Sequence, residues 1–160
     1  TELKEQGSKI VFDPGPLVDQ IDIKMLFAVL HLTDIFLPNR REVKLLEKKL
    51  NLREPFHSWC LARNGSLIVE KDGAHPFYSY TKEQTLRHTP FKVAVLDTTG
   101  AGDSFAAGLI FGLLQDSPSL ARAIQFACAC GALTATFSEP HQNFSVETIE
   151  KLIQTQGVLE

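Results

Sequence analysis

Short apolar runs alternate with longer segments of helical periodicity in the first third of the chain. Ser8–Asp13 and Asp34–Leu37 are each followed by a proline and are typical of buried strands that end in turns. Asp19–Leu32 lies between them and carries apolar residues at helical spacing, with Asp19 as the expected N-cap. A second helix is expected over Glu42–Leu50. Strand, helix, strand and helix in this order predict parallel strands joined by crossover helices, and therefore an α/β fold.

The middle of the chain predicts further strands. Trp59–Arg63 and Leu67–Glu70 flank the turn Asn64-Gly65-Ser66, a pattern that favours a hairpin. His75–Tyr80 predicts another strand, and the apolar Val93–Leu96 predicts a strand that leads directly into a glycine loop.

Three helices are expected after that loop, over Ala106–Leu114, Leu120–Phe137 and Val146–Ile153. The middle helix is rich in alanine, which is a strong helix former. Its small residues predict close packing against a sheet or a loop; they are Ala127, Ala129, Gly131 and Ala132.

Composition places the chain among globular domains. Its 160 residues are 44% hydrophobic and 22% charged, which is enough apolar material for one domain with a core. The net charge of −3 offers no broad attraction for nucleic acid or an anionic membrane, and no apolar run approaches the roughly 20 residues of a membrane span. The first residues lack the plan of a signal peptide. Three cysteines without metal-ligand spacing (Cys60, Cys128 and Cys130) predict free thiols and a reducing, cytoplasmic setting.

The stretch richest in chemical groups is Val95–Phe105, VLDTTGAGDSF. Gly100 and Gly102 allow backbone conformations that a side chain would block. A strand that turns through glycine into a helix leaves N–H groups unpaired, and these groups, with the positive end of the helix dipole, bind phosphate or an oxyanion. Asp103 on this turn has two interpretations: a base that accepts a proton from a hydroxyl, or a helix cap.

The nine residues Asp97–Phe105, followed by the small residues Ala106, Ala107 and Gly108, resemble the C-terminal motif of the ribokinase-like (phosphofructokinase-B-type) sugar kinases. The resemblance implies a ribokinase-like three-layer α/β/α fold with a mostly parallel sheet, of which this chain is the C-terminal, nucleotide-binding half. It also implies ATP-dependent phosphorylation of a hydroxyl on a sugar or a related small alcohol. The motif does not choose among the substrates of the family.

The resemblance assigns roles within this motif. Asp103 would be the catalytic base, and the backbone amides of Gly100, Ala101 and Gly102 would form the anion hole. Asp97 and Thr99 would help to hold K⁺ beside it. Asp97 equally suits a residue that rigidifies the loop, so both interpretations stay open.

Two polar residues follow the strand predicted at Asp34–Leu37. Asn39 and Glu42 have the spacing of a capping box, in which Asn39 is the N-cap. The family carries an N-x-x-E motif at this place, which implies contact with Mg²⁺ and the nucleotide phosphates; the two roles are compatible. Asp13, at the end of the first predicted strand, is either a ligand-facing group or a turn-stabilising residue.

Further nucleotide contacts are implied at Gly65 and Cys128. Gly65 is the one glycine kept from the K/T-x-G-x-x-G motif of the family, and Cys128 stands where relatives have an asparagine that faces adenine. The segment Thr136–Asn143 corresponds to the loop that helps to hold the monovalent cation.

The resemblance covers only the C-terminal half of such a kinase, because the sugar-binding half and its lid have no counterpart here. The chain is therefore expected to be a fragment of a longer kinase or to need a partner, either a complementing N-terminal half or a second copy in a homo-oligomer. Two alternatives stay open: a non-catalytic kinase half that binds nucleotide or serves assembly, and a nucleoside or vitamin kinase of the same family.

Overall fold

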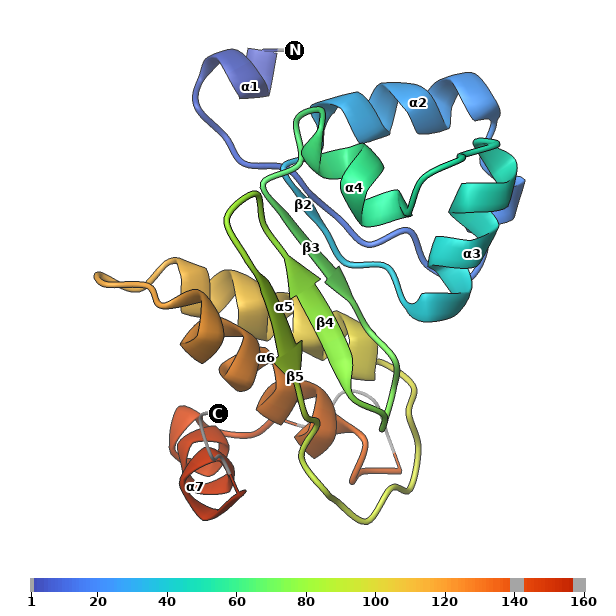
Figure 1. Cartoon of the computed structure of the whole chain (residues 1–160). Helices are drawn as coiled ribbons and strands as arrows, with labels where there is room; N and C mark the ends of the chain where they lie inside the picture. Colours follow the sequence, from blue (N-terminus) through green and yellow to red (C-terminus); the bar gives the residue numbers. More distant parts are fainter. Residues whose placement is uncertain (1, 139–142, 157–160) are drawn as a thin grey trace. The chain divides into compact units, whose positions relative to one another are not determined.

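The computed structural model describes residues 2–138 and 143–156. The chain divides into two compact units, Thr1–His88 and Thr89–Glu160. In Figure 1 the first unit runs from blue to green and the second from yellow to red. The composition had predicted one domain and did not indicate this division.

The first unit contains a five-stranded sheet in the order β1-β2-β3-β4-β5. Its strands are β1 (Val11–Phe12), β2 (Ile35–Phe36), β3 (Leu67–Glu70), β4 (Phe77–Tyr80) and β5 (Thr85–His88). β1 and β2 pair in parallel, as the order of strands and helices predicted. β3 pairs in parallel with β2 and antiparallel with β4, and β4 pairs antiparallel with β5. The sheet is therefore mixed, and β5 had no counterpart in the prediction.

The helices of this unit are α1 (Glu2–Glu5), the 3₁₀ helix η1 (Val18–Gln20), α2 (Ile23–Leu32), α3 (Arg40–Lys49) and α4 (Phe56–Leu61). The N-cap of α2 is Asp22, whose carboxylate accepts hydrogen bonds from the amides of Lys24 and Met25 at 2.9 and 3.1 Å. The prediction of Asp19 as the cap was wrong because Asp19 lies in η1, where the chain has not yet entered the α-helix.

The hairpin predicted around Asn64-Gly65-Ser66 does not form. Residues Phe56–Leu61 form the helix α4, and β3 pairs with β2 on one side and β4 on the other. Phe56, Trp59 and Cys60 of α4 are all buried at helical spacing. A single helical turn and a short strand both bury a compact apolar run, so periodicity over so few residues could not separate them.

The core of the first unit is built where α2, α3 and α4 pack on the sheet. It combines Leu26 and Leu30 of α2, Leu46 of α3, Phe36 of β2 and Ile68 of β3, each 2% exposed or less. Because side chains on these helices and on alternate strand positions share one core, the crossover helices are held on this face of the sheet.

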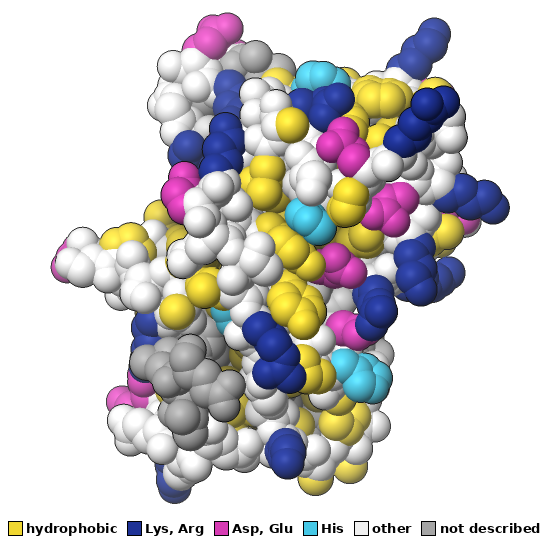
Figure 2. Space-filling model, in the orientation of Figure 1, with side chains coloured by type: hydrophobic (Ala, Val, Ile, Leu, Met, Phe, Trp, Pro, Cys, Tyr) yellow, Lys and Arg dark blue, Asp and Glu magenta, His cyan; other side chains and the backbone are white. Residues whose placement is uncertain are grey.

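The sheet face is less well covered beyond α4. Tyr78 of β4 is 41% exposed, and the rings of His57 and Tyr80 stack at 3.9 Å between centroids. Figure 2 shows hydrophobic side chains over β3 and β4, bordered by histidine and acidic groups.

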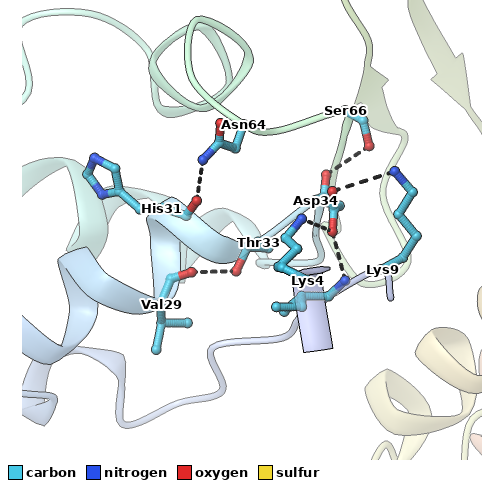
Figure 3. A network of polar contacts seen from close by, with 9 residues as sticks. Lys4, Lys9, Val29, His31, Thr33, Asp34, Asn64 and Ser66 are labelled. Atoms are coloured by element: carbon cyan, nitrogen blue, oxygen red, sulfur yellow. Dashed lines mark hydrogen bonds and ion pairs between the residues drawn. The ribbon is translucent and has the colours of Figure 1, made fainter. Parts of the chain in front are cut away.

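A buried carboxylate anchors the beginning of the chain at the amino end of β2 (Figure 3). Asp34 accepts hydrogen bonds from the Lys4 ammonium at 2.6 Å and the Ile10 amide at 2.8 Å, and Lys9 lies 3.7 Å away. The Ser66 hydroxyl donates to the Asp34 carbonyl at 3.0 Å. Burial alone would raise the pKa of Asp34, but its bonds to Lys4 and Ile10 bring it below the usual value.

The second unit is helical, with α5 (Ala101–Leu113), α6 (Leu120–Thr134) and α7 (Val146–Gln156). α5 and α6 pack closely because Gly108 and Gly112 of α5 face Ala127 and Ala123 of α6. A Cβ on Gly112 would lie 2.7 Å from the Ala123 Cα. The small residues of α6 thus serve packing between helices, where the sequence had indicated a sheet or a loop.

The strand predicted at Val93–Leu96 is absent, since this segment is irregular and its end is held by a helix. The amides of Leu96 and Asp97 donate to the Ala135 carbonyl at the C-terminal end of α6, at 2.8 and 3.4 Å. The three cysteines are free, as predicted. Within the described residues, no helix is long and apolar enough to span a membrane.

Candidate active site

The carboxyl ends of the three parallel strands bring polar groups together in the first unit. Asp13 directly follows β1, Asn39 follows β2 and Lys71 follows β3. Asn39 and Lys71 pair as a parallel bridge, and the Lys71 ammonium forms an ion pair with the Asp13 carboxylate. Open α/β sheets bind ligands at this edge.

Asn39 and Glu42 form the predicted capping box at the start of α3. The Glu42 amide donates to Asn39 Oδ1 at 3.0 Å, and the Asn39 amide donates to Glu42 Oε2 at 2.8 Å. Asn39 Nδ2 also donates to Glu42 Oε1 at 2.7 Å. A carboxylate has about four acceptor positions, so each Glu42 oxygen keeps capacity for a further donor or a cation.

The environment of Glu42 works against its charged form. The residue is 3% exposed. Burial raises the pKa of Glu42 and the nearby Asp13 adds to the rise, while the bonds to Asn39 and the Lys71 ammonium oppose it. A cation beside the buried Glu42 would stabilise the charged form of its carboxylate.

The glycine loop of the second unit has the geometry of an anion site. Gly100 is the N-cap of α5 and adopts a left-handed conformation with φ of 77°, which favours glycine. Among the described residues, the amides of Gly100, Gly102 and Asp103 have no acceptor. The Ala101 amide instead donates to the Thr98 carbonyl at 3.1 Å. The open amides are therefore those of Gly100, Gly102 and Asp103, and the sequence-based set of three needs this correction at Ala101.

Asp103 lies in the first turn of α5 and is exposed. Its carboxylate makes no capping hydrogen bond, and within the described part of the chain it has no hydrogen-bond or ion-pair partner. The helix-cap interpretation is thus not realised. The positive end of the α5 dipole still favours a negative charge at this position.

Asp97 and Thr99 are joined within the loop. Asp97 Oδ1 accepts hydrogen bonds from the Thr99 amide at 2.9 Å and the Thr99 hydroxyl at 2.8 Å, and these bonds lower the pKa of Asp97. Thr134 of α6 donates to the Ser104 hydroxyl at 2.7 Å, next to Asp103. Asp97 therefore does rigidify the loop, and α6 supports the loop at both ends.

Packing accounts for Gly65, and Cys128 lies on α6 in the second unit. Gly65 precedes β3, at the amino end of the strand, whereas Lys71 follows its carboxyl end. A Cβ on Gly65 would lie 2.9 Å from the Cys60 carbonyl oxygen and 3.2 Å from the Phe36 ring, so packing requires glycine there. Cys128 is half-buried on α6, and burial raises the pKa of its thiol to about 12.

The predicted cation loop is described only in part. Of Thr136–Asn143, residues 139–142 lie outside the described residues. The Thr136 hydroxyl donates to the Leu133 carbonyl at 2.7 Å.

Sequence analysis assigned no role to Lys71. A signal was present, because Lys71 directly follows the apolar run Leu67–Glu70 and so falls at the carboxyl end of a predicted strand. Its pairing with Asp13 joins residues 58 positions apart, which no local pattern shows.

Comparison with known proteins finds one family model and several related kinases. The family model described as pfkB family carbohydrate kinase matches residues 1–145. An ATP-dependent ribose-1-phosphate kinase of Halopiger xanaduensis is 33% identical over 131 residues, which cover 82% of this chain and 41% of that protein. The 5-dehydro-2-deoxygluconokinase of Bacillus subtilis is 28% identical over 128 residues, which cover 78% and 39%. The chain thus spans about two fifths of the length of these relatives.

Solved structures confirm the expected ribokinase-like fold. An Escherichia coli protein described as ribokinase II superposes in its apo form with a TM-score of 0.79 and 31% identity, covering 96% of this chain and 51% of that one. Its complex with ATP and Mg²⁺ superposes with a TM-score of 0.77 and 30% identity over the same shares of both chains. A nucleoside kinase of Burkholderia thailandensis, at 23% identity and a TM-score of 0.83, supports the fold alone.

Proposed function

The chain belongs to the pfkB family of carbohydrate kinases, and from this premise we propose that it is the nucleotide-binding and catalytic half of an ATP-dependent kinase. Its acceptor would be a hydroxyl group of a sugar or a related small alcohol. The observation that carries the proposal is the loop at the start of α5, where the unpartnered Asp103 carboxylate lies beside amides without acceptors. A base and an anion-binding site on one turn suit the transfer of a phosphoryl group to a hydroxyl.

Each group of the loop has a defined task in this reaction. Asp103 accepts the proton of the acceptor hydroxyl. The amides of Gly100 and Gly102 donate hydrogen bonds to oxygens of the transferred group, where negative charge must be stabilised. The Ala101 amide donates to the Thr98 carbonyl, so Ala101 shapes the turn and donates no hydrogen bond to the transferred group. Bound ATP supplies the phosphoryl group.

The first unit supplies groups that fit Mg²⁺ in the form it takes with nucleotides. Within the described residues, no cluster of three or more His, Cys, Asp or Glu side chains could hold a metal ion. Mg²⁺ usually keeps several waters and binds through one or two carboxylates plus phosphates. Glu42, through a water, fits that mode, and Asn39 holds the carboxylate in place.

Other assignments rest on family membership. Asp97 and Thr99 provide oxygen atoms suited to K⁺ in addition to their bond with each other. Nucleotide contacts of Gly65 and Cys128 stay part of the proposal, although packing explains Gly65. The free thiols favour a reducing compartment such as the cytoplasm. Because the chain spans about two fifths of its relatives, a complementing N-terminal half or a second copy would complete the acceptor site.

Nucleotide binding is tested by calorimetric titration of the folded chain with ATP, with and without Mg²⁺. Glu42→Gln keeps the capping box but removes the charge, so it should abolish the magnesium dependence without unfolding α3. Binding that is unchanged in this variant would remove Glu42 from the site. No binding by a chain that is folded by circular dichroism would favour the alternative of a non-catalytic assembly module.

Catalysis is tested by phosphoryl transfer from ATP to a panel of sugars, nucleosides and vitamin-type alcohols, using the full-length gene product. Asp103→Asn should lower kcat by about 10²–10⁴-fold while ATP affinity is kept. The matched control is Asp116→Asn, an exposed aspartate after α5. A kcat for Asp103→Asn like that of the control would exclude Asp103 as the base, and the preferred acceptor in the panel would decide between sugar and nucleoside kinases.

A further inference from the structure

We propose that Thr134 of α6 is a positioning residue for phosphoryl transfer: through its bond to Ser104 it orients the first turn of α5, which carries Asp103. The inference rests on the proposed function, because it assumes that the glycine loop is the catalytic loop. Thr134 lies on a different helix from the motif Asp97–Phe105 and more than 25 positions after it.

Two consecutive residues at the C-terminal end of α6 hold both ends of the glycine loop. The Ala135 carbonyl accepts hydrogen bonds from the amides of Leu96 and Asp97, at 2.8 and 3.4 Å, where the chain enters the loop. The Thr134 hydroxyl donates to the Ser104 hydroxyl at 2.7 Å, where the chain leaves the loop through α5. Because the two anchors are adjacent on one helix, they fix the span that the loop has to bridge.

The first turn of α5 also packs directly on α6. A Cβ on Gly131 would lie 3.0 Å from the Ala101 carbonyl oxygen, so glycine lets the two backbones approach closely at this point. Thr134 follows three residues later, on the same face of α6, and contacts the same turn of α5 through Ser104. Packing sets the separation of the helices here, and the directional hydrogen bond favours one rotation of the turn.

The Thr134 hydroxyl lies where solvent cannot replace its contacts, since the residue is 4% exposed. Its single proton has two acceptors within reach, the Ser104 hydroxyl at 2.7 Å and the Cys130 carbonyl at 3.0 Å. The contact with Cys130 is the back-bond that threonine commonly makes within its own helix, and it would satisfy the hydroxyl by itself. The shorter contact with Ser104 therefore does more than satisfy a buried group, because it joins α6 to α5.

The orientation of this turn matters because the side chain of Asp103 is not held directly. Among the described residues, the Asp103 carboxylate has no hydrogen-bond or ion-pair partner. Its direction, and that of the open amides of Gly102 and Asp103, thus depends on the backbone that Ser104 continues. A base has to lie within hydrogen-bond reach of the proton it accepts, and a misplacement of about 1 Å can cost roughly 10²-fold in rate.

A purely structural role for Thr134 makes a different prediction. The two helices already pack through Gly108 and Gly112 of α5, further along their length. If the bond to Ser104 served only this packing, its loss would lower the free energy of unfolding and leave turnover by the folded enzyme unchanged. Steady-state kinetics therefore separates the two roles.

The test is phosphoryl transfer from ATP by the full-length gene product, with the acceptor preferred in the panel. Thr134→Val keeps the branched shape and removes the hydroxyl, so it should lower kcat by about 10–10²-fold while the KM for ATP stays near the wild-type value. Thr134→Ser keeps the hydroxyl and should restore most of kcat. The control is Thr155→Val on α7, where the hydroxyl donates to the Lys151 carbonyl at 2.9 Å; its kcat should equal that of the wild type.

Ser104→Ala tests the same bond from α5, and it replaces Thr134→Val if circular dichroism shows that the latter is unfolded. It should lower kcat to a similar extent, and the double variant should lose no more than either single variant, because both remove one interaction. A wild-type kcat in either folded variant, losses that multiply in the double variant, or a rise in KM alone would overturn the inference.

The kinetics of Asp103→Asn keep this inference distinct from the function it rests on. If Asp103→Asn loses turnover while folded Thr134→Val keeps the wild-type kcat, only the role of Thr134 is refuted. If Asp103→Asn keeps the kcat of its control, or the gene product transfers no phosphoryl group, the proposed function is refuted and this inference with it.

Discussion

The close packing of α5 on α6 leads to a prediction that separates tertiary packing from helix propensity. An exposed glycine within a helix gains about 1 kcal/mol of stability when it is replaced by alanine. Gly112 lies inside α5, so propensity alone predicts that Gly112→Ala stabilises the protein. The structure predicts the opposite, because the new methyl group would meet Ala123.

The size of the effect follows from the distances. The added Cβ would lie 2.7 Å from the Ala123 Cα and 2.9 Å from its Cβ, whereas ordinary contacts begin at 3.4 Å. The helices would have to separate by about 0.7 Å, since backbone cannot rotate away as a flexible side chain can. Overpacking of this kind costs about 1–3 kcal/mol, and the upper part of that range applies here. After the gain in propensity, we expect a net loss of about 1–2 kcal/mol.

The assay is urea unfolding followed by far-ultraviolet circular dichroism. Fluorescence of the single tryptophan would not serve, because Trp59 belongs to the first unit and Gly112 to the second. Ala107→Gly, on an exposed position of α5, measures the propensity contribution in the same helix and should cost about 1 kcal/mol. A Gly112→Ala variant more stable than the wild type would refute the packing argument.

Two further predictions concern a buried charge and a strained turn. Asp34→Asn should lower the stability of the first unit at pH 7 by about 1–2 kcal/mol, since it removes the charge that Lys4 and Lys9 neutralise. The pKa of Asp34 is lowered on folding, so its contribution to stability is complete above the ordinary value of 3.8 and is lost as the pH falls through the lower, folded value. The free energies of unfolding of variant and wild type should therefore converge as the pH falls below 3.8. A difference in stability that persists in acid would contradict this assignment. Gly100→Ala forces alanine to a φ of 77° and should lower the free energy of unfolding by about 1–2 kcal/mol. Gly7→Ala is the matched control: its φ is 81°, a Cβ there would meet no atom within 4 Å, and the same loss of stability is expected. Only Gly100→Ala should weaken ATP binding, and an equal loss of ATP affinity in both variants would count against the anion site.

Local sequence patterns predicted the features that depend on neighbouring residues. The capping box of Asn39 and Glu42 formed as predicted because its hydrogen bonds span three residues. The parallel pairing of β1 and β2 followed from the order of apolar runs and helices, whereas Leu67–Glu70 was predicted as one arm of a hairpin and instead pairs in parallel with β2. The turn through Gly100 into α5 was also predictable, since glycine there meets a local conformational demand.

Features that depend on distant partners were misread or missed. Val93–Leu96 has the composition of a strand, but the amides of Leu96 and Asp97 bond to the end of α6, a partner that only the fold supplies. The apolar run at Trp59 became helix because its side chains meet a core formed by α2 and β2. Local periodicity over one turn carries no information about such a core.

The sequence by itself thus determined the α/β order, the glycine loop and the family to which the chain belongs. Only the tertiary structure showed that the Ala101 amide donates to the Thr98 carbonyl within the turn and that Asp103 does not cap α5. It also showed the ion pair of Lys71 with Asp13, which lie on either side of β2. The physical reason is the range of the interactions. Caps and turns are made by residues a few positions apart, whereas the charges at the edge of a parallel sheet come from strands separated by whole crossover helices.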